Sequence, residues 1–282
     1  MRYPAAATFG VFHQVAVGCQ HCPFKALLLV IYFVWYIRST QSLLMKIGTI
    51  NIDWFKKSKS TKDLIIEKIK QQNFDFLIVT ENILSFSKDE RYFVYHTLAI
   101  PTDKQFQHLD YGKFLKGDTP IRTTIYSKHK ATELLQVADP YTSVSIKFLV
   151  EGKEIIIYAS IIGTWGIMHQ NDIAKVELEN FKNDLQNILL TNENVFIVGD
   201  FNTSFIKSEN REMATICSRE ELIKFTNKNS VIRITEDISD NIDHIFVSQS
   251  LAMNIKNQPS VFIESNLLKD EPHKGICFDI SI

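Results

Sequence analysis

Polar side chains that can bind a cation or transfer a proton stand at the ends of the most apolar segments of this 282-residue sequence. Carboxylates cost several kcal/mol to bury without a partner, so their position beside buried strands requires a compensating charge. A hard divalent cation compensates economically, because Mg2+ takes oxygen ligands and needs only one or two carboxylates. The set consists of Asn51, Asp53, Glu81, Asp200, Asn202, Asp243 and His273. It predicts a divalent-cation site that also contains an imidazole.

Each member of this set has a simpler interpretation when it is taken alone. Asp and Asn at a strand end are most often turn residues, and this applies to Asp53 and to Glu81. The run from Gly199 to Asn202 is a stronger signal, but it is still a short one. The order of the whole set along the chain is what favours a site.

The segments that must position these residues alternate between strand-like and helix-like patterns. The predicted strands are Lys46–Ile52, Asp75–Thr80, Tyr92–His96, Ile121–Ser127, Ser143–Val150, Ile155–Ile162, Val195–Val198, Ile242–Val247 and Gly275–Ile282, with a tight turn over 151–153. The predicted helices are one capped by Ser60, one over Asn171–Leu190, and one with a capping box of Ser218 and Glu221. Such a mixture suggests two sheets packed face to face with helices outside, although periodicity alone also allows a doubly wound parallel sheet.

Composition excludes several classes of protein. Hydrophobic residues make up 45% and charged residues 22%, which excludes a disordered tail, a collagen-like fibre and a polytopic membrane protein. The net charge of −1 excludes a histone-like polycation. Four cysteines do not make a disulfide scaffold, and the pair Cys19 and Cys22 lacks a second pair at zinc-finger spacing.

Residues 1–44 are interpreted as a hydrophobic leader separate from residues 45–282. Residues 1–45 hold three basic and no acidic side chains, so the remaining 237 residues carry 28 basic and 32 acidic groups, net −4. The apolar run 26–37 has 12 residues, fewer than the roughly 17 to 25 of a membrane-spanning helix. Three interpretations stay open: a short anchor or uncleaved signal, a non-native leader before Met45, or a packed extra helix. A cytoplasmic location is expected, with membrane association through 26–37 as the alternative.

Met45–Ile282 resembles the endonuclease/exonuclease/phosphatase superfamily, the deoxyribonuclease-I-like fold. The resemblance rests on Ile50–Trp54, Val79–Glu81, Val198–Asn202, Asn241–Ser248 and Pro272–Gly275. It implies an α+β fold, a four-layer α/β/β/α sandwich of two packed, mostly antiparallel sheets with outer helices. It also implies a hydrolase that cleaves phosphate esters with Mg2+ or Mn2+.

The resemblance further assigns the cation ligands. Glu81 would be the principal metal ligand, Asn51 would lie beside it, and Asp53 could contact a second metal position.

The remaining residues would handle water, protons and phosphate. Asp200 would orient or deprotonate the attacking water, and Asn202 would hold the phosphate. His273 would bind or protonate a phosphate oxygen, while Asp243 fixes its tautomer, as a carboxylate does for other catalytic imidazoles. His244 would point to the opposite face of its strand and is interpreted as structural.

The sequence departs from the family pattern in two places. Many members have Asp before the last His, whereas Pro272 stands here, preceded by Asp270 and Glu271. Many members also place a Tyr, His or Asn phosphate contact after the strand that includes Tyr158. Ser160, Thr164 and His169 are the candidate substrate contacts in that region. These departures favour weakened activity, and they keep a catalytically weakened binding module on this fold open as an alternative.

Nucleic acid is the expected substrate. Lys56 and Lys57 follow the first strand beside aromatic residues and could contact phosphates and bases, although a solvated loop is the simpler interpretation. The alternative substrates are lipid or small phosphate esters. No stable protein partner is predicted.

Overall fold

The computed structural model describes residues 44–83, 90–100, 120–163, 172–206, 216–268 and 272–282. They belong to a compact unit that covers Leu44–Ile282. The prediction of a leader over residues 1–44 stays a prediction, because 1–43 lie outside the described residues. None of the helices that the structure describes combines the length and the apolar composition that a membrane crossing requires.

The unit contains two six-stranded sheets. The first sheet has the order β11-β12-β1-β2-β4-β3, and the second has the order β5-β6-β7-β8-β10-β9. The strands of the first sheet are β1 Leu44–Asn51, β2 Phe76–Ile83, β3 Phe93–His96, β4 Pro120–Ser127, β11 Ser260–Ile263 and β12 Gly275–Ser281. Those of the second are β5 Ala131–Leu135, β6 Ser143–Val150, β7 Lys153–Ile161, β8 Val195–Asp200, β9 Val231–Arg233 and β10 Asp243–Ser248.

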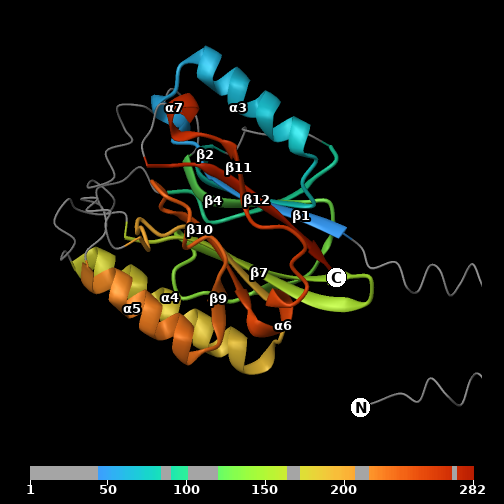
Figure 1. Ribbon diagram of the computed structural model, residues 1–282, viewed down its shortest axis with the longest axis vertical. Helices are drawn as coiled ribbons and strands as arrows, with labels where there is room; N and C mark the ends of the chain where they lie inside the picture. Colours follow the sequence, from blue (N-terminus) through green and yellow to red (C-terminus); the bar gives the residue numbers. More distant parts are fainter. Residues whose placement is uncertain (1–43, 84–89, 101–119, 164–171, 207–215, 269–271) are drawn as a thin grey trace, which may run out of the picture. The chain divides into compact units, whose positions relative to one another are not determined.

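Helices cover the outer face of each sheet, and the sheets face each other (Figure 1). The described helical segments are η1 Trp54–Lys56, α3 Lys59–Gln72, α4 Asp172–Thr191, α5 Ile216–Lys228, α6 Gln249–Ala252 and α7 Ser265–Leu268. α3 and α7 lie over the first sheet, and α4 and α5 over the second. The predicted four-layer α/β/β/α sandwich is confirmed.

Most strand pairs are antiparallel, as predicted, but each sheet contains one parallel pair. β1 pairs with β2 in parallel, and α3 makes the connection between them. β7 pairs with β8 in parallel, and α4 makes that connection. The carboxyl ends of two neighbouring strands therefore lie at the same edge of each sheet.

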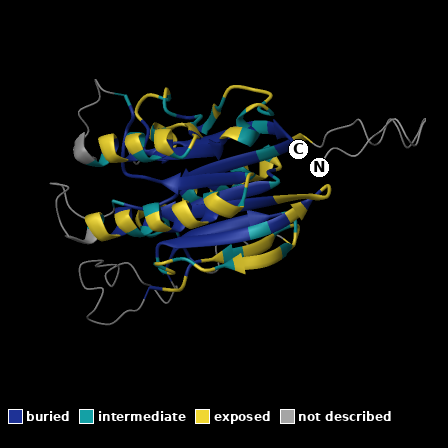
Figure 2. Cartoon of the chain, turned by 90° about the horizontal axis from the view of Figure 1, so that it is seen from below, coloured by how far each residue is buried: buried dark blue, intermediate teal, exposed yellow. Residues whose placement is uncertain are grey.

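The central strands are almost completely buried, whereas the edge strands β3 and β5 and the outer surfaces of the helices are largely exposed (Figure 2). Between the sheets the rings of Phe196 and Phe278 lie 6.3 Å apart, and those of Phe76 and Phe148 lie 4.9 Å apart. Under α4, Phe181 packs edge-on against Tyr158 of β7 at 5.7 Å. Burying such rings contributes about 1.5–3 kcal/mol each, so the apolar strands fix the positions of the polar residues at their ends.

Two predicted helix caps are wrong. The first helix begins at Lys59, and its N-cap is Ser58, whose Oγ accepts a hydrogen bond from the Thr61 amide at 3.2 Å. The third helix begins at Ile216, so Ser218 lies inside it and cannot form a capping box. In contrast, the tight turn after β6 is confirmed, with Glu151 and Gly152 at φ 48° and 78°.

Candidate active site

Residues from both sheets meet where the carboxyl ends of the parallel strands lie. Asn51 is the last residue of β1 and pairs in register with Thr80 of β2. Asp200 is the last residue of β8 and pairs in register with Ile161 of β7. The Asn51 Nδ2 atom donates a hydrogen bond to Asp200 Oδ2 at 3.0 Å. This bond joins the two sheets, and it brings together residues 149 positions apart in the sequence.

The two acidic residues on the side of the first sheet have left-handed backbone conformations. Glu81 has φ 53° and Asp53 has φ 33°, values that L-residues other than glycine adopt rarely and at some cost. Hydrogen bonds of neighbouring side chains can offset this conformational cost. Next to Glu81, Asn82 Nδ2 donates to the Tyr126 hydroxyl at 2.9 Å. Near Asp53, Asn51 Oδ1 accepts a hydrogen bond from the Asp53 amide at 2.9 Å.

Asp53 is held by a lysine from the short helix that follows it. Lys56 Nζ lies 2.8 Å from Asp53 Oδ2. The Asp53 side chain is 3% exposed, whereas that of Lys56 is 62% exposed. The other carboxylate oxygen, Asp53 Oδ1, is buried and has no hydrogen-bond partner in the part of the chain that the structure describes.

The second sheet supplies its carboxylates from regular, paired strands. Asp200 of β8 lies directly opposite Asp243 of β10 in the antiparallel register. Gly199 permits the approach of β8 to β7, because a Cβ atom there would lie 1.9 Å from the Ser160 carbonyl oxygen. After the strand, the Asn202 amide donates to Asp200 Oδ1 at 2.8 Å, and Asn202 Nδ2 donates to the Ile162 carbonyl at 2.9 Å.

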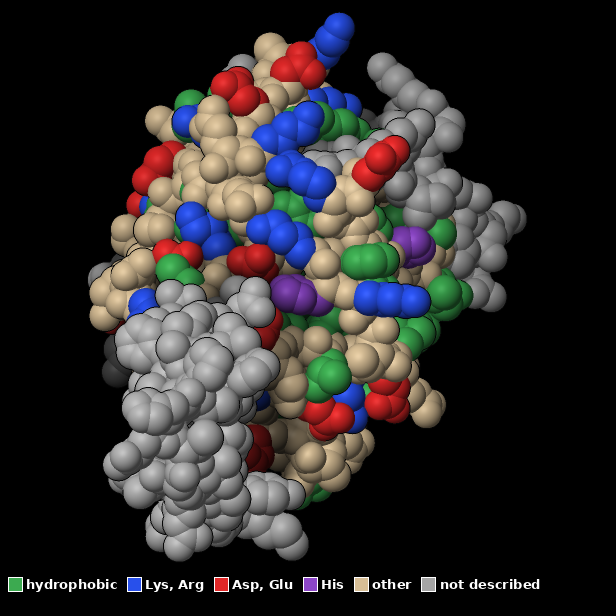
Figure 3. All heavy atoms as spheres, turned by 90° about the vertical axis from the view of Figure 1, so that its right-hand side faces the viewer, with side chains coloured by type: hydrophobic (Ala, Val, Ile, Leu, Met, Phe, Trp, Pro, Cys, Tyr) green, Lys and Arg blue, Asp and Glu red, His purple; other side chains and the backbone are tan. Residues whose placement is uncertain are grey.

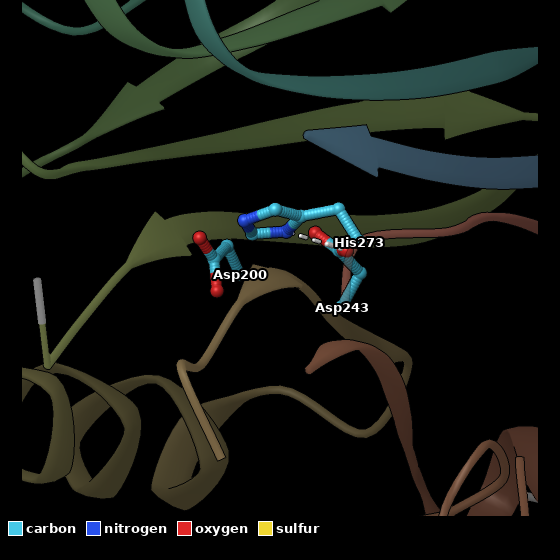
Figure 4. A group of neighbouring side chains, drawn as sticks. All are labelled: Asp200, Asp243 and His273. Atoms are coloured by element: carbon cyan, nitrogen blue, oxygen red, sulfur yellow. Dashed lines mark hydrogen bonds and ion pairs between the residues drawn. The ribbon is translucent and has the colours of Figure 1, made fainter. Parts of the chain in front are cut away.

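His273 completes this half of the site from the segment before β12 (Figure 4). Its Nδ1 lies 3.0 Å from Asp243 Oδ2, which also accepts from the Lys274 amide at 3.3 Å. The imidazole lies between Asp243 and Asp200, with its other ring nitrogen on the Asp200 side. One ligand atom from each of these three residues lies within 4.8 Å of the others, so the buried group could hold a metal ion.

Burial and mutual repulsion raise the proton affinity of the carboxylates. Burial raises the pKa of Asp200 to about 7, with further contributions from Asp243 and Glu81, while His273 and the Asn202 amide oppose them. Burial and then the neighbouring Asp53 also raise the pKa of Glu81, against the opposing charges of His273, Lys56 and Arg122. Asp53, Glu81, Asp200, Asp243 and His273 are therefore linked by electrostatic interactions.

One charged residue near this site was not predicted. Arg122 lies on β4 between Ile121 and Thr123, which pair with Asn82 and Thr80, so it stands opposite Glu81. Its Nη1 donates to Glu177 Oε1 of α4 at 3.1 Å, and both side chains are buried. The signal available in the sequence was an arginine within an otherwise uncharged strand. Its ion pair extends from the first sheet to a helix of the second.

The predicted substrate contacts are less well placed. Ser160 is completely buried, and its Oγ lies 2.8 Å from Ser143 Oγ, so the structure does not bring it to an accessible surface. Thr164 and His169 lie outside the described residues, as do Asp270 and Glu271. Lys57 ends the short helix after Asp53, with a backbone hydrogen bond from its amide to the Trp54 carbonyl.

His244 is separated from the site by the alternation of its strand. Its Nε2 contacts the Thr203 carbonyl at 2.8 Å, and its Nδ1 contacts Thr235 Oγ1 at 3.0 Å. Burial lowers the pKa of His244 to about 4, so the ring is neutral. These contacts agree with the interpretation of His244 as structural.

The residues present fit a hard divalent cation. Asp53 Oδ1 and Asp243 Oδ1 are buried carboxylate oxygens without a hydrogen-bond partner among the described residues. Such atoms are costly unless a positive charge compensates them. The group that could hold an ion contains two carboxylates and one imidazole, and Asn51 is hydrogen-bonded to Asp200. Oxygen atoms predominate among these donors, which suits Mg2+ or Mn2+ better than a soft metal.

No family model and no curated protein sequence matches this chain. Solved structures do resemble it. A Neisseria 3' phosphatase, NExo, bound to a product DNA hairpin has a TM-score of 0.60 at 12% identity, covering 84% of this chain and 100% of that one. An AP endonuclease from Archaeoglobus fulgidus has a TM-score of 0.58 at 14% identity, covering 84% and 99%. An endonuclease/exonuclease/phosphatase family protein from Leptotrichia buccalis has a TM-score of 0.54 at 16% identity, covering 84% and 100%. The chain therefore has the endonuclease/exonuclease/phosphatase fold.

Proposed function

We propose that this protein is a divalent-metal-dependent phosphoesterase that hydrolyses phosphodiester bonds in DNA or RNA. The observation that supports this most strongly is the meeting of acidic, amide and imidazole groups from both sheets at one edge of the sandwich. The hydrogen bond from Asn51 to Asp200 joins the two sides of that site. Had these residues been dispersed over separate surfaces, they would not have supported a shared active site.

A cation would be held on the side of the first sheet. Glu81 would be its principal ligand, with Asn51 beside it and Asp53 Oδ1 within the same acidic group. Bound there, a divalent cation would stabilise charge on a phosphoryl oxygen as a Lewis acid and lower the pKa of a bound water. Glu81 has a left-handed backbone conformation, and its carboxylate interacts electrostatically with Asp53, His273 and Lys56.

Protons would be handled on the side of the second sheet. Asp200 would accept a proton from the attacking water, a role suited to a group whose pKa burial raises to about 7. Asp243 Oδ2 holds Nδ1 of His273, so the proton on that nitrogen is fixed and the opposite nitrogen faces the site. That nitrogen would bind or protonate a phosphate oxygen. The Asn202 side chain donates a hydrogen bond to the Ile162 carbonyl. In this proposal it would also contact the phosphate.

Nucleic acid is the substrate class that the neighbouring structures and the surface favour. One neighbour binds a product DNA hairpin, and another is an AP endonuclease. Beside Asp53, Lys62 lies over the Trp54 ring at 4.6 Å, and Lys56 and Lys57 stand on the same short segment. Lysines beside an aromatic ring suit phosphates and bases. The face shown in Figure 3 carries basic and acidic side chains intermixed. Such a mixed surface does not favour strong, sequence-independent binding of duplex nucleic acid.

A gel assay tests this proposal directly. Linear, nicked and abasic DNA and single-stranded RNA would be incubated with the full chain and Mg2+, with EDTA and the Asp200→Asn variant as controls. We expect cleavage of at least one nucleic acid, lost in both controls. Turnover of a phosphoinositide, sphingomyelin or a small phosphate ester, with every nucleic acid intact, would support the phosphatase or phospholipase-type alternative instead.

The binding-module alternative rests on Pro272 and on the burial of Ser160. If no ester is cleaved but nucleic acid still binds equally to the wild type and to Asp200→Asn, the fold serves as a scaffold. An enzyme should lose orders of magnitude in rate in that variant, because the group that activates water is gone.

A further inference from the structure

A lysine ammonium already occupies part of the acidic site. The short helix Trp54–Lys56 begins at Asp53, and the Lys56 amide donates to the Asp53 carbonyl at 3.1 Å. This tight turn returns the Lys56 side chain over the carboxylate, where Nζ lies 2.8 Å from Oδ2. A lysine ammonium is a compact point charge, so it resembles a small cation more than a guanidinium does. The left-handed conformation of Asp53 is therefore linked to the placement of this charge.

Carboxylates outnumber the opposing charges around the site. Four carboxylates share the electrostatic environment: Asp53, Glu81, Asp200 and Asp243. Among the described residues, the opposing cations are Lys56, His273 and Arg122, and Arg122 is already paired with Glu177. Lys274 Nζ is directed elsewhere, 3.4 Å from Glu264. The carboxylates therefore outnumber the opposing groups that are not paired elsewhere, an excess that a bound divalent cation would offset.

We propose that Lys56 is a built-in counter-ion of Asp53, which takes the place of a second divalent cation, so that the site binds one divalent ion, at Glu81. The inference rests on the proposed metal-dependent function and goes beyond it, because it fixes the metal stoichiometry and names the residue that sets it. Asp53 Oδ2 is committed to the ammonium, while Oδ1 stays available to the ion at Glu81.

The competing interpretation is that Lys56 serves substrate alone. Its side chain is 62% exposed, so it could leave Asp53 and contact a phosphate. In that case the ammonium would not exclude an ion from Asp53, and removing it would change substrate affinity without changing the number of metal ions bound.

Metal binding without substrate separates the two interpretations. The full chain would be titrated with Mn2+, and the free aqueous ion would be followed by electron paramagnetic resonance, with calorimetry as a second readout. The variants are Lys56→Met, which removes the charge, and Lys56→Arg, which keeps it. Lys59→Met is the matched control, because Lys59 is an exposed lysine at the start of α3. Circular dichroism checks that each variant is folded.

We expect the wild type, Lys56→Arg and Lys59→Met to bind one Mn2+ and Lys56→Met to bind two. The double variant Lys56→Met with Asp53→Asn should return to one, because the second ion needs the Asp53 carboxylate. Two ions in the wild type, or one in Lys56→Met, would overturn the inference and leave the proposed phosphoesterase intact. A second ion bound by Lys59→Met would also overturn the inference, because loss of any nearby positive charge, and not of Lys56 in particular, would then admit a second ion. Absence of binding in every protein would overturn this inference together with the proposed metal dependence.

Discussion

The two halves of the site are built in different ways. On the side of the first sheet, Glu81 and Asp53 project from left-handed backbone positions, and the nearby charges include Lys56 and Arg122. On the side of the second sheet, Asp200 and Asp243 lie opposite each other on regular antiparallel strands. The first half therefore relies on local backbone strain and cations, whereas the second relies on strand register.

This difference suggests a division of labour. In the first half, burial and Asp53 raise the pKa of Glu81 against the opposing charges of His273, Lys56 and Arg122, so a bound cation would stabilise the ionised carboxylate. In the second half, burial, Asp243 and Glu81 raise the pKa of Asp200 to about 7, against His273 and the Asn202 amide, which favours exchange of a proton near neutral pH. We infer that the first half holds the ion and the second half moves protons.

The largest expected effect comes from removing the proton acceptor. Asp200→Asn keeps the shape of the side chain and one of its two hydrogen bonds, from Asn51 or from the Asn202 amide, but it cannot accept a proton from water. We expect the rate to fall by about 10²–10⁴-fold, the usual contribution of general acid–base catalysis. Single-turnover cleavage measures this, with Asp63→Asn on the exposed surface of α3 as the control. A rate within about threefold of the wild type would remove Asp200 from the mechanism.

A smaller effect is expected when only the orientation of the imidazole is disturbed. Asp243→Asn can present an amide nitrogen to His273 Nδ1 and so favour the wrong tautomer. We expect a loss of about 10²-fold in kcat with a shifted pH–rate profile, since orientation and proton position change together. A lower rate with an unchanged pH profile would indicate that Asp243 is structural only.

The sequence could predict the second half of the site more completely than the first. The apolar run before Asp200 and the alternation around Asp243 and His244 follow from strand periodicity, and all three residues lie where that period places them. The position of Glu81 does not follow, because β2 continues to Ile83 and the left-handed turn occurs inside it. No local sequence pattern predicts a left-handed backbone conformation at this glutamate.

Long-range contacts explain what else was missed. The ion pair of Arg122 with Glu177 joins residues 55 positions apart. The edge strands β5, β9 and β11 have only five, three and four residues, too short for a clear alternation. Helix ends were displaced because Ser58 and Ser60 are equivalent by type, and only the packed helix distinguishes them.

The pH dependence of stability would sharpen the comparison between the halves. Asp200 has an ordinary pKa of 3.8, and burial raises it to about 7 in the folded protein. The folded state therefore binds more protons between these values, and its stability should fall as the pH rises from about 4 to 7. We expect this fall in the metal-free wild type relative to Asp200→Asn, measured by urea unfolding. A constant difference between the two proteins across this range would contradict the raised pKa.

The smallest expected effect concerns the helix that follows the first half. Ser58→Ala removes the bond to the Thr61 amide and should lower the free energy of unfolding by about 1 kcal/mol. Ser60→Ala is the matched control and should cost less, because Ser60 lies inside α3 and is exposed. A larger loss in the free energy of unfolding for Ser60→Ala than for Ser58→Ala, measured by chemical denaturation, would indicate that Ser60 is the cap.

The most direct test of the account is the position of a bound ion. Crystals of the full chain grown with Mn2+ would show it by anomalous scattering. We expect one peak within about 2.0–2.3 Å of a Glu81 carboxylate oxygen, lost in Glu81→Gln while Asp200 and His273 keep their positions. A peak held by Asp200, Asp243 and His273 instead, with Glu81 uninvolved, would contradict the division between the two halves.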